Sequence, residues 1–390
     1  MKLKGEDYDY AQYLILLVIS FTVYLSNQMV VNTVTKFANT LTTSSQLIGF
    51  IGGMWGLASF FTRPFSGQVV DNEAHKKLLI VCMFGLVLSN LVLIGADSIP
   101  AILISRFLNG VAWGFGSTVC VTTACDSLPK ERMIWGLGIY TMMQTLAQVI
   151  GPSIAIWIIE TYSFRALFIT TFLIMVIALV LSMFFKTKHQ RRVVRKYSFS
   201  LKGMFAPKAF IPSSLLMCNT MEVSAIAGFI LIYADSIGVT GLGLFFLVQA
   251  LSIVVTRPFV SRFTTQKNQY YVTIFSECLI IIGLVNLFFS RSTAGFMFSA
   301  VLFGFGKSGA QPALTNMCVS SVSQDERGRA SNTYYTFQDL GQIFGANIAG
   351  LLAGVLGYGG AFLSIAFIVA AFLLFFIFAY MIPHMREVTA

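Results

Sequence analysis

The chain has 390 residues, of which 56% are hydrophobic and only 11% are charged, and its net charge is +10. Soluble domains carry about 25% charged residues, so this composition excludes an ordinary soluble enzyme or binding domain. A transmembrane helix needs about 20 apolar residues, and twelve such helices leave about 150 residues for everything else. We therefore predict an all-α membrane protein of twelve spans that is not an enzyme.

Hydropathy along the chain predicts where these spans lie. They cover residues 11–34, 46–70, 77–96, 99–124, 133–160, 164–185, 209–234, 241–262, 270–289, 294–318, 330–356 and 361–383. A basic stretch without acidic residues follows the sixth span. We predict an N-terminal six-helix bundle at 1–186, a cytoplasmic linker at 187–208 and a C-terminal six-helix bundle at 209–390.

The basic residues are distributed by membrane side. The predicted outer loops contain only Lys36, Arg165 and Arg291, and most of the other 23 lie in the inner loops or at the inner helix ends. This asymmetry follows the positive-inside rule and predicts cytoplasmic termini in a plasma membrane. It accounts for the positive charge without nucleic acid as a partner. The six cysteines, all in or beside spans, are interpreted as small packing residues.

An internal repeat is the strongest pattern in the sequence. Thr62-Arg63-Pro64-Phe65 recurs 194 residues later as Thr256-Arg257-Pro258-Phe259. The same offset relates a second series, Tyr140, Gln144, Gln148, Gly151 and Ala155, to Tyr334, Gln338, Gln342, Gly345 and Ala349. Parallel repeats of six spans are one arrangement used by alternating-access carriers. The repeat therefore predicts a transporter made of two pseudo-symmetric bundles.

The loop between the second and third spans contains a motif of a known transporter family. Gly67 is followed by Asp71 and, after a turn, by Lys76. This segment resembles the GxxxD-plus-basic motif of the major facilitator superfamily, although Asn72 and Ala74 replace a basic residue and a glycine. The resemblance implies that Gly67, Asp71 and Lys76 belong to a cytoplasmic gate.

Three further motifs resemble the proton-coupled drug and metabolite exporters of that superfamily, in particular a Gram-positive-type branch. Arg106 begins an RxxxGxxxG pattern in the fourth span, and Gly151-Pro152 lies in the fifth, where exporters carry a kinked helix. Asp339 begins an Asp-x-Gly in the eleventh span. The resemblance implies proton coupling or substrate binding for Arg106, and gating for Gly151 and Pro152.

Five ionisable residues lie inside the predicted spans, where a charge is costly and marks a functional site by default. They are Arg106, Glu222, Glu277, Lys307 and Asp339. Glu222 is our first candidate for the proton carrier, because a low-dielectric cavity disfavours its charged form. Asp339 is the second, unless Lys307 holds it ionised, and Arg106 is a third coupling candidate. Glu277 lies on a span that is peripheral in this family, which favours a structural role.

Polar and aromatic side chains on the predicted cavity helices are candidates for substrate binding. The Tyr-x3-Gln-x3-Gln series places its side chains along one helix face. It therefore either contacts substrate or bonds helix to helix. Together with three of the ionisable residues, these side chains form the predicted substrate-binding set, which is Gln28, Asn32, Arg106, Trp113, Tyr140, Gln144, Glu222, Lys307, Gln311, Tyr334 and Gln338.

These features predict a monomeric bacterial exporter that exchanges an amphiphilic small molecule, zwitterionic or anionic, for protons. Its partners are then the substrate, protons and the lipid bilayer. No cofactor is expected, since a proton gradient supplies the energy. Two alternatives remain open, which are a proton-coupled uptake symporter and a transport-silent membrane sensor or scaffold.

Overall fold

The computed structural model describes residues 10–72, 75–126, 133–185, 205–265, 268–322 and 327–383, and the regular structure in these ranges is helical throughout. The long helices are α1 (Tyr10–Val31), α3 (Ser45–Asn72), α4 (His75–Ile94), α5 (Ile99–Asp126), α6 (Met133–Thr161), α7 (Phe164–Phe184), α8 (Phe210–Ser236), α9 (Phe245–Phe263), α10 (Gln269–Phe289), α11 (Thr293–Ser320) and α12 (Arg327–Phe376). Short elements are α2 (Val34–Leu41), the 3-10 turns Pro207–Ala209 and Leu242–Leu244, and a π-helical end at Ile377–Met381.

Nine helical stretches of the described residues are long and apolar enough to cross a membrane, judged by length and composition. The last of them, Arg329–Met381, is broken at Gly357, which has φ 73° and ψ 168°. Only glycine adopts such angles readily, so one residue separates two spans. With this division, and with the 28-residue helices α3 and α11, the described helices supply the twelve predicted segments.

The 194-residue repeat is present in the helix bounds. Adding the offset to the bounds of α5, Ile99–Asp126, gives Thr293 and Ser320, which are the bounds of α11. The starts of α4 and α6 map in the same way onto the starts of α10 and α12. The first residue of α7 maps onto the residue after Gly357. The two halves therefore repeat the same helices and not only the same motifs.

A side-chain contact is also repeated. Ser105 on α5 donates to the backbone oxygen of Ser89 on α4, at 2.8 Å. Its repeat equivalent, Ser299 on α11, donates to the backbone oxygen of Gly283 on α10, at 2.9 Å. Serine hydroxyls bond helix to helix where no water is present, so the same bond fixes the same helix pair in each half.

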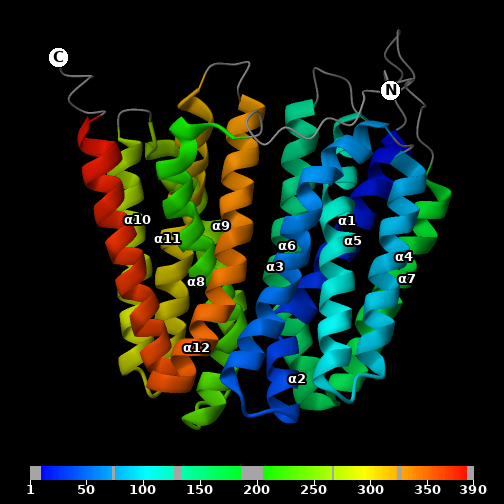
Figure 1. The fold of residues 1–390 in the computed structure, drawn as a ribbon, viewed down its shortest axis with the longest axis horizontal. Coiled ribbons are helices and arrows are strands. Elements are labelled where there is room, and N and C mark those ends of the chain that lie inside the picture. The colour runs from blue at the N-terminus through cyan, green and yellow to red at the C-terminus, as the bar shows by residue number, and fades with distance from the viewer. Residues whose placement is uncertain are drawn as a thin grey trace. The chain divides into compact units, whose positions relative to one another are not determined.

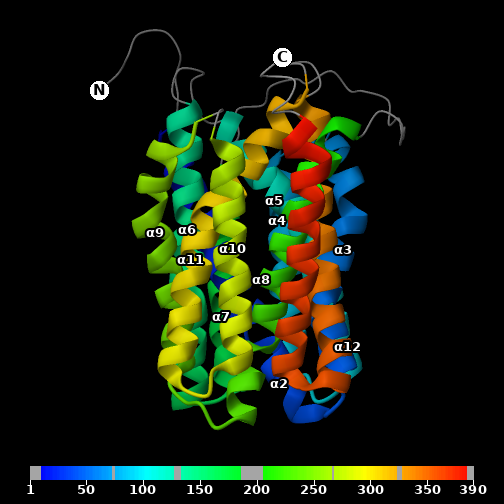
Figure 2. The same ribbon diagram turned by 90° about the vertical axis from the view of Figure 1, so that its left-hand side faces the viewer.

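Two compact units form the molecule. One contains residues 1–30 and 58–198, and the other contains 31–57 and 199–390. In the second unit α8 packs against α12 and α10 against α11, as Figures 1 and 2 show. In the first unit α4 packs against α5 and α7. The predicted bundle boundaries at 186 and 209 stay a prediction, and most of the linker, 186–204, lies outside the described residues.

Two expectations were wrong in detail. The first span, predicted at 11–34, ends earlier as α1, and α2 follows where an outer loop was expected, so Lys36 lies on a helix. The polar pair Asn32-Thr33 interrupts the helix there.

The second concerns the cysteines, which were interpreted as packing residues. Cys278 is exposed, unlike Cys82, Cys120, Cys218 and Cys318, which are buried. Helix periodicity on α10 places it on the face opposite the packed one.

Candidate functional site

The five ionisable residues predicted inside the spans all lie within helices and away from solvent. Glu222 and Glu277 are 0% exposed, Arg106 is 1% and Asp339 is 4% exposed, and the side chain of Lys307 is 10% exposed. A charged side chain is seldom fully buried unless it has a partner. Their contacts therefore define where ion chemistry can occur.

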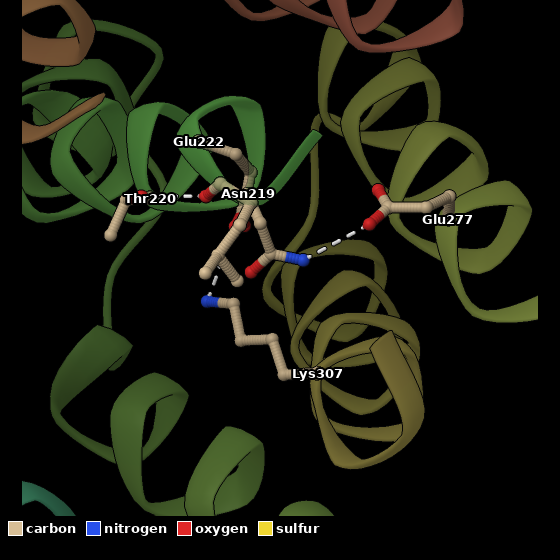
Figure 3. A network of polar contacts seen from close by, with 6 residues as sticks. Asn219, Thr220, Glu222, Glu277 and Lys307 are labelled. Atoms are coloured by element: carbon tan, nitrogen blue, oxygen red, sulfur yellow. Dashed lines mark hydrogen bonds and ion pairs between the residues drawn. The ribbon is translucent and has the colours of Figure 1, made fainter. Parts of the chain in front are cut away.

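Glu222 on α8 and Lys307 on α11 form an ion pair. The Lys307 Nζ atom lies 3.4 Å from Glu222 Oε2 (Figure 3). The ammonium also lies 5.8 Å from the centre of the Phe303 ring, one turn earlier on α11. Both members of the pair were predicted from the sequence, but Asp339 was considered as the counter-ion of Lys307, whereas the structure pairs the lysine with Glu222.

Glu277 on α10 is joined to the same helix junction by Asn219. Asn219 Nδ2 donates to Glu277 Oε1 at 3.3 Å, and Asn219 lies one turn before Glu222 on α8. Figure 3 shows Asn219 between the ion pair and Glu277. We call these four residues, Asn219, Glu222, Glu277 and Lys307, the carboxyl cluster. Sequence reasoning missed Asn219, although its three-residue spacing from Glu222 placed both on one face.

Glu277 was expected to have a structural role on a peripheral span, and that role stays a prediction. Its carboxyl is fully enclosed, and within the described part of the chain Oε2 has no hydrogen-bond donor. No group of three His, Cys, Asp or Glu residues among the described ones is arranged to hold a metal ion. The carboxyl cluster thus places a fully buried carboxyl, Glu277, beside the Glu222–Lys307 ion pair.

Arg106 lies in a different polar region, in the first unit. Its neighbours along α5 bond to α4, since Ser105 donates to the Ser89 backbone and Asn109 Nδ2 donates to Ser89 Oγ at 3.2 Å. Asn90 on α4 is also buried there. These uncharged residues make the α4–α5 contact polar, and the RxxxGxxxG pattern did not reveal them.

The predicted aromatic and glutamine residues of the first unit are partly packed. Trp113 is 7% exposed and meets the Tyr24 ring edge-on, with 4.7 Å between centroids. Tyr140 is 1% exposed, while Gln144 is half-buried and Gln148 is exposed. The Tyr-x3-Gln-x3-Gln face therefore passes from the packed interior to an accessible surface.

The other predicted binding residues are distributed over both units. Gln28 belongs to the first unit, and the second unit contains Asn32, Gln311, Tyr334 and Gln338. Gln311 is exposed, and Lys307 lies one turn before it on α11. An exposed amide at membrane depth is costly in lipid and is expected to face water. That these residues share one substrate stays a prediction.

The predicted gate residues lie on three helices. The backbones of Gly67 and Asp71 are in the last turns of α3, and the side chain of Asp71 lies outside the described part of the structure. Lys76 is in the first turn of α4, and Pro152 is inside α6. A Cβ on Gly151 would lie 3.0 Å from the Cβ of Gln28, so α1 and α6 approach closely there.

A second close contact lies in the second unit and was not predicted. Gly49 and Gly53 on α3 pack directly on the Ala346–Gly350 turn of α12. Nearby, Lys36 on α2 pairs with Asp235 near the end of α8, at 2.8 Å between Nζ and Oδ2. We call this region, residues 31–57 with the helix ends they contact, the α2–α3 closure.

Comparisons with known proteins agree with this architecture. The family model described as Major Facilitator Superfamily matches residues 16–276 and, separately, 212–389. A staphylopine export protein of Staphylococcus aureus is 23% identical over 335 residues, which cover 81% of this chain and 82% of that protein. Multidrug resistance protein 2 of Bacillus subtilis is 23% identical over 354 residues, with 87% and 88% covered. The solved structure of nucleoside transporter NupG has a TM-score of 0.79 at 14% identity, covering 95% of this chain and 100% of NupG.

Proposed function

The chain belongs to the major facilitator superfamily, and we propose that it exports an amphiphilic, zwitterionic or anionic small molecule in exchange for protons. It is a multi-span transporter and not an enzyme. The proposal adds the direction of transport, the coupling ion and the class of substrate. It also places the chain as a monomer in a bacterial plasma membrane, with both termini in the cytoplasm, as the basic residues of the loops predict.

The observation that carries the proposal is the ion pair between Glu222 and Lys307. A carboxylate with 0% exposure is tolerated as an anion only while a cation compensates it. Binding a proton at Glu222 ends that compensation and makes Lys307 available to another anion. Proton binding at one residue thus changes which anion the ammonium of another residue can bind, which is the coupling that an exchanger needs.

The charges within the two units support the substrate class. Arg106 lies at membrane depth in the first unit, and Lys307, Glu222 and Asp339 lie at membrane depth in the second. This combination of cations and carboxylates suits a zwitterionic or anionic substrate. The exposed amide of Gln311 next to Lys307 on α11 adds a hydrogen-bonding group for such a substrate. Export is supported by relatives named as a staphylopine export protein and as a multidrug resistance protein.

The test uses purified protein in liposomes with an acidic lumen and two probes, staphylopine and a lipophilic cationic dye. Addition of a transported probe is expected to make the lumen more alkaline, because protons leave as the probe enters. Glu222→Gln is expected to abolish accumulation driven by the gradient, while probe-for-probe exchange continues. Gln28→Glu, a change at the repeat-equivalent position, is the matched control for an altered charge at the same depth.

Two other outcomes contradict the proposal. Acidification of the receiving compartment together with uptake means symport. Equal signals from protein-containing and empty liposomes for both probes, with probe binding retained, mean a sensor or scaffold that does not transport.

A further inference from the structure

Glu277 is the buried ionisable residue that the proposed exchange does not use. It lies on α10, is 0% exposed, and accepts one hydrogen bond from Asn219. Its Oε2 atom is buried and accepts no hydrogen bond from the described residues. A lone carboxylate in such surroundings costs far more than one amide hydrogen bond returns. Glu277 is therefore neutral, with a proton, while Lys307 is paired with Glu222.

The internal repeat provides a control for whether the fold requires this carboxyl. The residue equivalent to Glu277 on α4 is Met83, which is also 0% exposed. α4 and α10 nevertheless begin at equivalent residues and make the same serine bond to the next helix. An apolar side chain is thus sufficient for packing at this place, which argues against the structural role predicted from sequence.

Each member of the carboxyl cluster differs from the residue at its repeat-equivalent position in the first half. Asn219, Glu222, Glu277 and Lys307 correspond to Leu25, Gln28, Met83 and Trp113. None of these four first-half residues is ionisable. In the second half, each ionisable member of the carboxyl cluster forms an ion pair or a hydrogen bond with another member. The four polar residues therefore form a unit that is additional to the repeated scaffold.

We propose that Glu277 is the alternate proton-binding group and alternate counter-ion of Lys307, so that two carboxyls share one proton and one ammonium. This inference rests on the proposed proton exchange. In the state that the structure shows, Glu277 carries the proton and Glu222 is ionised. When Glu222 gains a proton, an O–H bond forms there, the O–H bond of Glu277 breaks, and its proton leaves to water.

The charge balance favours such an exchange, because neither end state buries an uncompensated charge. With one ammonium, one carboxylate and one carboxylic acid, the cluster has no net charge in either state. A change that left Lys307 alone, or both carboxyls ionised, would bury an uncompensated charge. The flexible four-carbon stem of Lys307 allows its ammonium to move toward the second carboxyl. Asn219 holds that carboxyl in place beside the pair.

Titratable groups outside the carboxyl cluster stay the same in each of its variants. On Glu277's own helix and the helices packed against it, they include Cys218 on α8, Asp339 on α12, and Tyr270 in the first turn of α10, which lies against Tyr380. Glu222 on α8 and Lys307 on α11 are the ionisable members of the cluster that face Glu277. Only substitutions within the carboxyl cluster are expected to change the number of protonated carboxyls. A difference between variant and wild type therefore cancels the signal from Asp339.

The experiment is infrared difference spectroscopy of the purified full chain, reading the carbonyl stretch of protonated carboxyl groups. Glu277→Gln is expected to lose one such group relative to wild type. Glu222→Gln is also expected to lose one, because Glu277 then releases its proton to compensate Lys307. Lys307→Met is expected to gain one. Asn219→Leu, which copies the first half, is expected to weaken or shift the Glu277 band.

Two results would overturn the inference. A band that survives Glu222→Gln unchanged means that Glu277 keeps its proton permanently and is structural. An unchanged spectrum in Glu277→Gln means that Glu277 is already ionised in wild type. If Glu277→Gln fails to fold, Glu277→Met, which copies Met83 of the first half, is used instead. The infrared measurement needs no substrate and tests this inference alone. Transport in liposomes that does not depend on a proton gradient would contradict the proposed function, so the two failures are distinguishable.

Discussion

The two halves of the chain share a scaffold but not an ion chemistry. α4 and α5 in the first unit and α10 and α11 in the second begin at repeat-equivalent residues and are joined by equivalent serine bonds. The first pair surrounds this bond with uncharged residues and Arg106. The second pair contributes Glu277 and Lys307, which meet Glu222 and Asn219 of α8.

This difference teaches that packing and coupling are separable in this fold. Bonds that hold helices together recur at equivalent positions, because both halves need the same geometry. The proposed proton-binding residues, Glu222 and Glu277, have the uncharged repeat equivalents Gln28 and Met83, and a second copy would bury a second set of charges at a cost of several kcal/mol. Substitutions at equivalent positions can therefore separate the two contributions.

The largest expected effect is on folding, at a close helix contact. A Cβ on Gly345 of α12 would meet the backbone oxygen of Met221 and lie 2.8 Å from its Cα, whereas at Gly151 it would meet the Gln28 side chain. Backbone atoms yield less than side chains, so Gly345→Ala is expected to remove most folded protein and Gly151→Ala to lower Tm moderately. Size-exclusion profiles and thermal unfolding in detergent measure this. Gly354→Ala is the control, because nothing lies within 4 Å of that site; equal losses at all three positions contradict the account.

The next effect concerns the buried ammonium. Removing both carboxyls in Glu222→Gln/Glu277→Gln leaves Lys307 without either member of the carboxyl cluster as counter-ion, and about 3–5 kcal/mol of stability is expected to be lost. Each single variant is expected to lose much less, because the other carboxyl compensates. Thermal unfolding of the four proteins in a double-mutant cycle measures the coupling. Additive losses would show that the two carboxyls act independently of one another.

Smaller losses of stability, which are more similar between the two halves, are expected at the repeated serines Ser105 and Ser299. Ser105→Ala removes one hydrogen bond, worth about 1 kcal/mol. Ser299→Ala removes the equivalent bond and also the acceptor of Asn286 Nδ2, at 2.8 Å, so about twice that loss is expected. Thermal unfolding with Ser→Gly at both sites as a cavity control measures the ratio. A larger loss at Ser105 would mean that the shared scaffold depends on Arg106 and its neighbours.

The smallest effect on stability is expected at the α2–α3 closure. The side chains of Lys36 and Asp235 are 26% and 56% exposed, and such pairs contribute about 0–1 kcal/mol. Lys36→Asp is expected to lower Tm slightly by placing like charges together, and Lys36→Asp/Asp235→Lys is expected to restore it. No recovery in the exchanged variant would indicate that the position of each residue matters more than the charge pair.

Much of the fold could be predicted from the sequence. Hydropathy located the helices, and the 194-residue offset found in the motifs also relates the bounds of α5 to those of α11. The offset relates both motifs and helix bounds, because a repeated motif occupies the same position in the equivalent helix of each half. The α1–α2 break was not predicted, because Asn32 and Thr33 are short interruptions in a continuous apolar run.

The site was less predictable, for a physical reason. The cost of a charge in lipid singled out Glu222 and Lys307, and these two residues form a pair. Glu277 was given a structural role because its span is peripheral in the resembled family, and hydropathy does not tell which face of a helix a residue occupies. Asn219 is uncharged and gave no signal of its own. Residues whose roles depend on a partner from a distant helix need the packing as well as the pattern.

The exposed thiol of Cys278 has a practical consequence for studying this protein. It follows Glu277 directly on α10, while Cys82, Cys120, Cys218 and Cys318 are buried. A membrane-permeant maleimide dye is therefore expected to label this position ahead of those four cysteines. Its fluorescence would then report, during turnover, on the helix that carries the proposed alternate proton-binding residue.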